Sequence, residues 1–408
     1  MNPRILQVWL HGSKLAELEH LRNRTLRLRF ADSAIATYGI RSTVLSLSLP
    51  TTRKRVEGRA LDTFLEGLLP EGQLRGALER ELNVRPNDTF ALLRHIGQEC
   101  AGAIQFVVDG AEPAAGYVRE LTELELESLI AQLPTLDPPD ELPLTASLGG
   151  VQAKVLLTKT PHGWAWPALG AQSTHIFKPE PITDVALPGL IEGEHWAMEL
   201  ASVCGIRVAR TELASVGGRR TLIVERYDRQ DGVRLHQEDF TQALSLSARD
   251  KYESSLRQPS RLGRLADLGS AQARDPREFR RELLRLVTFN VAVGNGDAHS
   301  KNYSIIIDKA GAVEMAPLYD CAPVFIMNPR FHHAGHAVNG QVNLNYVTAA
   351  HLEEEAVSWK IRPQEARDVV REVIESVRVN ANDVAIDPTL NNVPSKIARR
   401  CANLLNDV

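Results

Sequence analysis

The chain has 408 residues, of which 43% are hydrophobic, enough to bury the cores of two domains or of one large two-lobed domain. Its 47 Lys and Arg residues nearly balance its 51 Asp and Glu residues. The resulting net charge of −4 excludes nucleic-acid binding driven by overall charge and leaves room only for a local basic patch. No apolar run approaches the roughly 18 residues of a membrane span, and residues 1–20 turn polar too early for a signal peptide.

The chain has four cysteines (Cys100, Cys204, Cys321 and Cys401), which are scattered and include no CxxC pair. We therefore expect free thiols in a reducing cytoplasm and no structural zinc site.

Short alternating runs at the start of the chain, "RILQVWL" and "TVLSLSLP" within residues 1–50, predict strands of an antiparallel sheet. The period changes over residues 60–98, where three segments predict helices. A Pro-rich, acidic stretch at 133–145 is the clearest linker. Strands return over 147–228 around one helix, and the chain after residue 236 is mostly helical. This order predicts an α+β protein in which a lobe rich in strands precedes a helical lobe.

One turn, "GNGDAHSKNYS" at 294–304, lies between an apolar helix and the start of a strand. The strand is followed by Asp308 and Gly311, which suit a tight hairpin connection, and then by a second strand. Because a hairpin brings its open ends together, we expect Asn302 before the first strand to lie beside Asp320 after the second. An amide oxygen and a carboxylate are hard oxygen ligands, which suit Mg²⁺ on a polyphosphate.

Asp297 precedes Asn302 by the D-x-x-x-x-N spacing of the catalytic loop of protein kinases, in which the Asp accepts the proton of the substrate hydroxyl and the Asn binds a metal. Asp320 stands where protein kinases have their second metal-binding Asp. The competing interpretation is that Asp297 and Asn302 only cap the turn. His299 either orients Asp297 or packs in the loop, and Lys301 either neutralises the transferred phosphoryl group or is solvated.

A kinase needs an ATP-binding segment upstream of the base. In "TASLGGVQAKVLL" (145–157) the paired Gly149 and Gly150 would let backbone N–H groups approach phosphates, although the segment also suits an ordinary hairpin turn. Lys178 lies at a strand end and could reach the phosphates, or it could belong to an edge strand. Glu194, on the following helix, could pair with Lys178 or lie on the surface.

A further apolar strand, "RTLIVERYDR" (220–229), ends in charge. The backbone at Glu225 and Tyr227 could hydrogen-bond adenine there, or the segment could be a plain strand end. Gln237 could begin and cap a helix or face the same site.

Taken together, these segments resemble the HipA family of toxin serine/threonine kinases over nearly the whole chain. The segments that carry the resemblance follow the order of the family: "SLSLP", "FLEGLLPEG", "SLGGVQAK", "HIFKPE", "VERYDR", "RLHQEDFTQAL", "KYE", "GNGDAHSKNYS" and "PLYD".

The resemblance implies a two-lobed protein-kinase-like fold with an ATP cleft between the lobes. It implies an N-terminal HipA-type subdomain over 1–110, the remainder of the N-lobe with phosphate loop and hinge over 111–228, and a helical C-lobe over 229–408. The implied site has Asp297 as base with His299 and Lys301 beside it, and Asn302 and Asp320 as Mg²⁺ ligands. The implied ATP-binding residues are Ser147, Gly149, Gly150, Val151, Lys154, Lys178, Glu225, Tyr227 and Gln237.

The resemblance also implies that Ser147 is autophosphorylated, which would place negative charge beside the phosphates of ATP. It implies a HipB-like helix-turn-helix antitoxin as partner, with operator DNA bound through that partner, and a protein substrate such as an aminoacyl-tRNA synthetase.

Two alternatives stay open: a small-molecule phosphotransferase, and a corepressor acting through a DNA-binding partner. A zinc hydrolase built on "FHHAGH" (331–336) is not favoured, because the spacing of its three histidines matches no known closed site.

Overall fold

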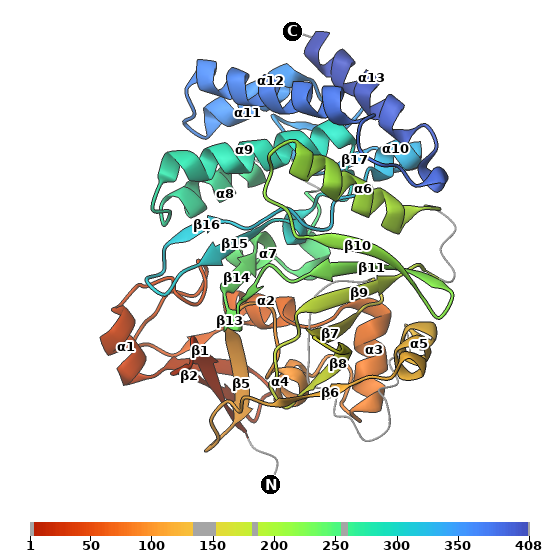
Figure 1. Ribbon diagram of the computed structural model, residues 1–408. Coiled ribbons are helices and arrows are strands. Elements are labelled where there is room, and N and C mark those ends of the chain that lie inside the picture. Colours follow the sequence, from red (N-terminus) through yellow and green to blue (C-terminus); the bar gives the residue numbers. More distant parts are fainter. Residues whose placement is uncertain (1–3, 134–151, 182–186, 254–259, 407–408) are drawn as a thin grey trace. The chain divides into compact units, whose positions relative to one another are not determined.

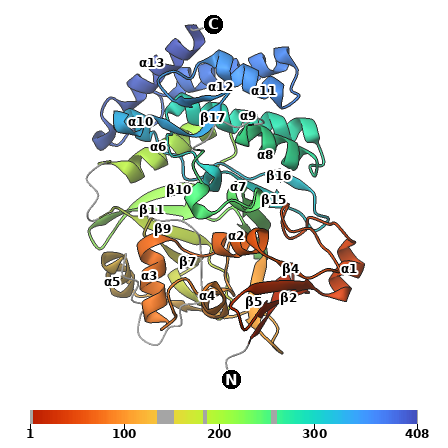
Figure 2. The same cartoon turned by 180° about the vertical axis from the view of Figure 1, so that it is seen from behind.

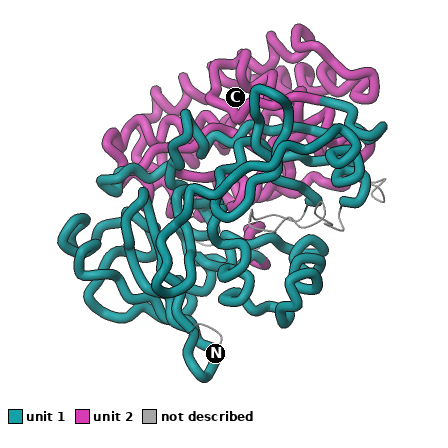
Figure 3. The backbone as a smooth tube through the Cα atoms, turned by 60° about the horizontal axis from the view of Figure 1, so that its bottom comes forward, with its two compact units in different colours: residues 1–180, 214–248, 306–312 teal, residues 181–213, 249–305, 313–408 magenta. Residues whose placement is uncertain are grey.

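The structure is a computed structural model that describes residues 4–133, 152–181, 187–253 and 260–406. The chain forms two compact units, which are coloured separately in Figure 3. Unit 1 consists of Met1–Glu180, Ala214–Ala248 and Ile306–Ala312, and unit 2 of Pro181–Leu213, Arg249–Ile305 and Val313–Val408. Each unit is therefore assembled from segments that are distant in sequence. The division at 110/111 and 228/229 stays a prediction.

The first sheet of unit 1 is antiparallel, with the strand order β4-β3-β2-β1-β5. Its strands are β1 (Ile5–Leu10), β2 (Ser13–His20), β3 (Leu26–Phe30), β4 (Val56–Glu57) and β5 (Ile104–Val108). The alternation in β1 directs Leu6, Val8 and Leu10 into the core, where each is at most 1% exposed. The helices of this part are α1 (Asp32–Tyr38), α2 (Arg59–Gly67), α3 (Gly72–Glu81) and α4 (Thr89–Ile96). The predicted helices within 60–98 are thereby confirmed.

The second predicted strand of the N-terminal region, "TVLSLSLP" at 43–50, is wrong, because the structure has turns there. Val44 and Leu45 are buried as the pattern suggests. The backbone nitrogens, however, donate to side chains rather than to a neighbouring strand: that of Ser48 to Ser46 Oγ at 3.0 Å and that of Leu47 to Glu238 Oε1 at 2.7 Å. Serine hydroxyls that bond nearby backbone compete with sheet pairing.

The second sheet has the order β10-β11-β9-β7-β8-β6. Its strands are β6 (Tyr117–Glu120), β7 (Val155–Thr160), β8 (Gly163–Ala168), β9 (His175–Pro179), β10 (Thr211–Val216) and β11 (Arg219–Glu225). Helix α5 (Glu123–Gln132) begins with a capping box between Thr122 and Glu125. Unit 1 also contains β12 (Arg229–Gln230), β13 (Val233–Arg234), β14 (His236–Asp239) and α7 (Phe240–Ala243).

A buried ion cluster fixes the chain that follows β11. Glu99, which is fully buried, accepts from Arg226 Nη1 at 3.1 Å, from Arg229 Nη2 at 3.0 Å and from Arg234. Asp228 accepts from Arg226 Nη2 at 2.8 Å. Burial alone would raise the pKa of Glu99, but the three guanidinium groups outweigh it and hold that pKa below the ordinary value. The cluster thus joins residue 99 to the segment 226–234.

We predict that Glu99→Gln strongly destabilises the chain, because it leaves the buried guanidinium groups of Arg226 and Arg229 and the partly buried one of Arg234 without their shared carboxylate. Breaking one partner of a buried ion pair typically costs about 3–5 kcal/mol. Urea unfolding followed by circular dichroism measures the loss. Glu375→Gln, which removes the exposed pair with Arg378, is the matched control and should change the unfolding free energy little. Equal losses in the two variants would contradict the role given to the cluster.

Unit 2 is mainly helical, as predicted for the C-terminal part. Its helices are α6 (Leu190–Val203), α8 (Arg261–Ser270), α9 (Pro276–Val293), α10 (Val324–Met327), α11 (Ala349–Ser358), α12 (Pro363–Asn380) and α13 (Val393–Asn406). The later strands are β15 (Ser304–Ile307), β16 (Val313–Met315), β17 (His333–Val338) and β18 (Gln341–Asn343). Helix α12 contacts α9, α11 and α13, and Figures 1 and 2 show these helices side by side.

Helix α9 leads directly into the polar turn. Its first N–H groups donate to Asp275 Oδ1, and Pro276 occupies its first position, where a missing N–H does no harm. Its apolar residues Leu283, Leu284 and Phe289 are fully buried, so the helix end is held firmly by packing. None of the helices in the described part of the chain is long and apolar enough to span a membrane.

Candidate active site

The polar turn begins where α9 ends at Gly294, whose φ of 74° is left-handed and suits glycine. Two asparagine side chains then set its path: Asn295 Oδ1 accepts from the backbone N–H of Asp297 at 3.0 Å, and Asn295 Nδ2 donates to Asn290 Oδ1 at 2.7 Å. At Gly296 a Cβ would lie 2.3 Å from the carbonyl oxygen of Phe331, so no larger residue fits. The turn therefore has a single backbone path, which presents Asp297.

Asp297 lies at the surface of unit 2, with its side chain 50% exposed. His299 Nε2 is 4.0 Å from Asp297 Oδ1, and Tyr252 Oη donates to the same oxygen. The carboxylate is therefore exposed enough for another molecule to approach it, and His299 and Tyr252 are its polar neighbours.

Asn302 and Asp320 lie side by side, as the hairpin predicted. Asn302 Nδ2 donates to the carbonyl oxygen of Asp297 at 2.9 Å and to that of Asp320 at 3.5 Å. Tyr319 Oη donates to the carbonyl oxygen of Lys301 at 2.6 Å, which ties the two ends of the hairpin together. The structure thus gathers Asp297, Asn302 and Asp320 within one part of unit 2.

The donor chemistry of this pair fits a hard divalent cation. Asn302 Nδ2 donates to two carbonyl oxygens, so the NH₂ group faces them and the amide oxygen is directed away. An amide oxygen and the Asp320 carboxylate are ligands of the type that Mg²⁺ takes when it also keeps water and phosphate oxygens. Among the described residues there is no group of three His, Cys, Asp or Glu that could hold a metal.

Asp320 has an unusual backbone, because its φ is 55°. Non-glycine residues adopt this left-handed conformation rarely, and Asp and Asn tolerate it better than most. The conformation accompanies the sharp change of direction after β16.

His299 and Lys301 are both buried, at 5% and 9% exposure. Burial, followed by the positive charge of Lys251, lowers the pKa of His299 to about 4, so the imidazole is neutral at pH 7. His299 Nδ1 is buried and has no hydrogen-bond partner among the described residues. The burial of Lys301 does not agree with the alternative that it is a solvated surface lysine.

The predicted phosphate-binding residues lie partly outside the described residues: Ser147, Gly149, Gly150 and Val151 belong to the stretch 134–151. Lys154 immediately precedes β7. Lys178 is 6% exposed on β9, which pairs with β7 on one side and β11 on the other, so the alternative of an edge-strand lysine is wrong. Glu194 is 4% exposed on α6, so the surface alternative is wrong for it as well. Lys178 and Glu194 belong to different units, and their pairing stays a prediction.

The backbone after β11 continues its pairing with the chain that leads into β9, and the prediction that Glu225 and Tyr227 bind adenine stays a prediction. The backbone N–H of Arg226 donates to the carbonyl oxygen of Thr174 at 2.9 Å. Because backbone groups alternate in direction along a strand, those of Glu225, the last residue of β11, point to the opposite side, and Tyr227 follows in a turn. Tyr227 Oη donates to Gln237 Oε1 at 2.6 Å, which brings two predicted residues together.

Gln237 does not begin a helix; it is the second residue of β14. The helix cap is Asp239, which accepts from the backbone N–H of Gln242 at 2.9 Å. The sequence contains the capping pair Asp239 and Gln242, and the prediction placed the helix start two residues too early.

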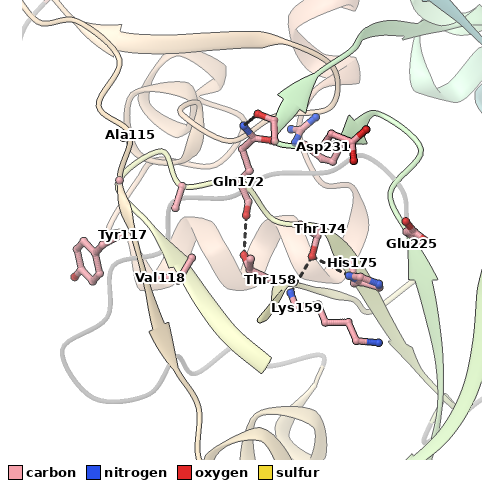
Figure 4. A pocket seen from close by; sticks show the side chains of 14 residues that line it. Ala115, Tyr117, Val118, Thr158, Lys159, Gln172, Thr174, His175, Glu225 and Asp231 are labelled. Atoms are coloured by element: carbon pink, nitrogen blue, oxygen red, sulfur yellow. Dashed lines mark hydrogen bonds between the residues drawn. The ribbon is translucent and has the colours of Figure 1, made fainter. Parts of the chain in front are cut away.

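A pocket of about 760 Å³ lies within unit 1, beside the end of β11 (Figure 4). Thr158, Lys159 and His175 line it together with Glu225. The Thr174 hydroxyl accepts from the backbone N–H of Lys159 at 2.9 Å and contacts His175 Nδ1 at 2.8 Å. Of the predicted nucleotide-binding residues that the structure describes, Glu225 alone lines this pocket.

Two buried ionisable residues flank Gln237. His236 Nε2 donates to the carbonyl oxygen of Leu45 at 2.8 Å, and burial lowers the pKa of His236 to about 4. Glu238 Oε1 accepts from the backbone N–H of Leu47, and burial raises the pKa of Glu238 to about 8. In the folded chain near pH 7 the imidazole of His236 is therefore uncharged and the carboxyl of Glu238 is mostly protonated.

We predict that Glu238→Gln changes how stability depends on pH. Between the ordinary glutamate pKa of 4.5 and the folded value of about 8, the folded chain keeps a proton that the unfolded chain has lost. The contribution of Glu238 to wild-type stability therefore falls as pH rises through this window. Relative to wild type, Glu238→Gln should gain up to about 4 kcal/mol between pH 5 and pH 8, measured by urea unfolding. The exposed Glu112→Gln is the control; a Glu238→Gln curve parallel to that of wild type would refute the prediction.

The histidines at 331–336 do not form a metal site in the described residues. His336 is buried, with Nδ1 3.8 Å from Glu253 Oε2, whereas His333 is exposed. All four cysteines are free thiols, as expected.

Two family models match the chain in sequence order: the HipA N-terminal domain over residues 6–107 and the HipA-like C-terminal domain over residues 146–381. The chain belongs to the HipA family.

Relatives agree with this assignment. The serine/threonine-protein kinase toxin HipA of Shewanella oneidensis is 33% identical over 310 residues, which cover 72% of this chain and 70% of that protein. The protein Y4mE of Sinorhizobium fredii is 36% identical over 340 residues, covering 78% and 77% of the two chains.

A solved structure also matches: a chain of the Shewanella oneidensis MR-1 complex of toxin–antitoxin proteins HipA and HipB with operator DNA superposes with a TM-score of 0.82. It is 26% identical, and the match covers 98% of this chain and 97% of that one. The α+β, two-lobed, kinase-like fold expected from the sequence is thereby confirmed.

Proposed function

We propose that this HipA-family chain is an ATP- and Mg²⁺-dependent protein kinase that transfers the γ-phosphoryl group to a serine or threonine of another protein. The observation that carries the proposal is the grouping of Asp297, Asn302 and Asp320, which supplies a base and two oxygen ligands in the kinase order. A relative that is 33% identical bears the name of a serine/threonine-protein kinase toxin, which supports the same reaction.

In the proposed reaction the acceptor oxygen attacks the γ-phosphorus, the bond to the bridging oxygen of ADP breaks, and Asp297 receives the acceptor's proton. Asn302 and Asp320 would hold Mg²⁺, which when bound neutralises charge on the phosphate oxygens. His299 stays neutral beside the base, and Lys301 can offset charge on the transferred group. These residues act by position and by electrostatic stabilisation.

On the nucleotide side, Lys178 would contact the phosphates, with Lys154 and the loop of Gly149, Gly150 and Val151 beside it. The backbone of Glu225 and Tyr227 would bind adenine, and the hydrogen bond to Gln237 would hold Tyr227 in place. The fixed direction of the strand end after Arg226 supports this role.

We further propose that a HipB-like antitoxin neutralises the chain and links it to operator DNA. The support is the solved relative, whose complex contains HipA, HipB and operator DNA. As acceptor we propose a protein such as an aminoacyl-tRNA synthetase, and membership of the HipA family favours a protein acceptor over a small molecule. A corepressor role through the antitoxin is compatible with activity.

Asp297→Ala should lower phosphoryl transfer from γ-labelled ATP to proteins of a cell lysate by about 10²–10⁴-fold, because the acceptor loses its base. Circular dichroism should show an unchanged fold. Asp368→Ala removes an exposed carboxylate that accepts a hydrogen bond from the exposed Gln364, and it should keep wild-type activity. Wild-type transfer by Asp297→Ala would end the kinase proposal.

Ser147→Ala should abolish self-phosphorylation and retain transfer to other proteins, because the proposed modification acts on the loop and not on the base. Phosphopeptide mass spectrometry after incubation with Mg·ATP reads out the site. Thr145→Ala, which removes a neighbouring hydroxyl, is the control and should keep the phosphate on Ser147. An unchanged label in Ser147→Ala would show that the modified residue lies elsewhere.

A further inference from the structure

A tyrosine hydroxyl already occupies the carboxylate that the proposed reaction uses as its base. Tyr252 Oη donates a hydrogen bond to Asp297 Oδ1. Burial and the neighbouring Asp297 carboxylate raise the pKa of Tyr252 above its ordinary value, so the phenol keeps its proton and stays a donor. A neutral hydroxyl that donates to Asp297 is chemically what a serine or threonine acceptor must also be.

The backbone at Tyr252 is fixed from both sides. The carbonyl oxygen of Lys251 accepts from the backbone N–H of Ser300 at 3.1 Å, inside the catalytic turn. The backbone N–H of Glu253 donates to the carbonyl oxygen of Gly335 at 2.9 Å, and the Glu253 carboxylate accepts from the backbone N–H of Ala337 at 3.0 Å. These bonds place Tyr252 beside Asp297 without help from its own side chain.

The side chain of Tyr252 is less constrained than its backbone. Tyr252 is 43% exposed, whereas the side chain of Glu253 is only 5% exposed. One edge of the ring contacts the imidazole of His299, with centroids 5.0 Å apart and planes at 81°. A half-exposed ring can rotate toward solvent without opening a cavity, so the hydroxyl can leave Asp297 while the backbone stays in place.

We propose that Tyr252 belongs to the acceptor side of the active site: its hydroxyl holds the place on Asp297 that the acceptor hydroxyl takes, and it is displaced when the acceptor binds. The inference rests on the proposed kinase function. In the transfer step the acceptor's proton passes to Asp297, and Tyr252, already turned away, neither gains nor loses a proton or a phosphoryl group.

The consequence is competition between two hydroxyl donors for one carboxylate. Tyr252→Phe keeps the ring and its contact with His299 but removes the competing donor. The KM for a protein acceptor should fall, and kcat/KM for that acceptor should rise by about 3- to 10-fold, the equivalent of one half-exposed hydrogen bond. The KM for ATP should not change, because the nucleotide does not displace Tyr252.

The experiment compares wild type, Tyr252→Phe, Tyr346→Phe and Asp297→Ala, using γ-labelled Mg·ATP with dephosphorylated casein as the probe acceptor. Release of phosphate to water is the second readout, because water must also reach Asp297. Tyr346 is 66% exposed and lies outside the site, so Tyr346→Phe controls for the loss of an exposed tyrosine hydroxyl. We expect both rates to rise in Tyr252→Phe alone, and to be lost in Asp297→Ala.

An active wild type with an unchanged or lower kcat/KM in Tyr252→Phe would overturn this inference alone; a fall in kcat at constant KM would show that Tyr252 orients the base. Phosphotyrosine at residue 252 would also overturn it, since Tyr252 would then be an acceptor. If neither wild type nor Tyr252→Phe transferred phosphate to casein or water, the proposed function would fail and this inference with it.

Discussion

A carboxylate with no contact to solvent is the constraint on which the segment after β11, the proposed adenine-binding segment, depends. Glu99 can stay ionised in the interior only while guanidinium groups surround it, and those groups come from the segment that follows β11. Arg226 and Asp228, which flank Tyr227, are held by the same cluster. The backbone at Tyr227 therefore has little freedom. Preorganisation of this kind spares a binding site the entropy of ordering a loop.

The polar turn at 294–304 obtains its rigidity in a different way, from short-range hydrogen bonds rather than from charge. Asn295 fixes the start of the turn and Asn302 its end, and each uses its amide group on nearby polar groups. The packing of α9 holds the start of the turn, and the hairpin of β15 and β16 returns the chain beside Asn302. The neutral amides of Asn295 and Asn302 set the backbone path that carries Asp297.

Contacts between residues close in sequence were predictable, and contacts between residues far apart in sequence were mostly not. The relation between Asn302 and Asp320 was predictable because one hairpin joins them. Whether Lys178 lies on an edge strand or an inner strand stayed open from the sequence, because strand order depends on pairing that no local pattern contains. The Glu99 cluster was missed since Arg234 lies 135 residues from its partner. The contact between Tyr252 and Asp297 spans 45 residues, and its sole signal was the short motif "KYE".

The left-handed backbone of Asp320 has a wider implication. A residue with a Cβ adopts this conformation at a cost of about 1 kcal/mol, and glycine would relieve it. Glycine would make the fold more stable at this position, so the aspartate is explained by its side chain and not by the stability of the backbone. If Asp320 has the proposed role of a Mg²⁺ ligand, a relative that has lost phosphoryl transfer no longer needs the carboxylate and could place glycine at this position.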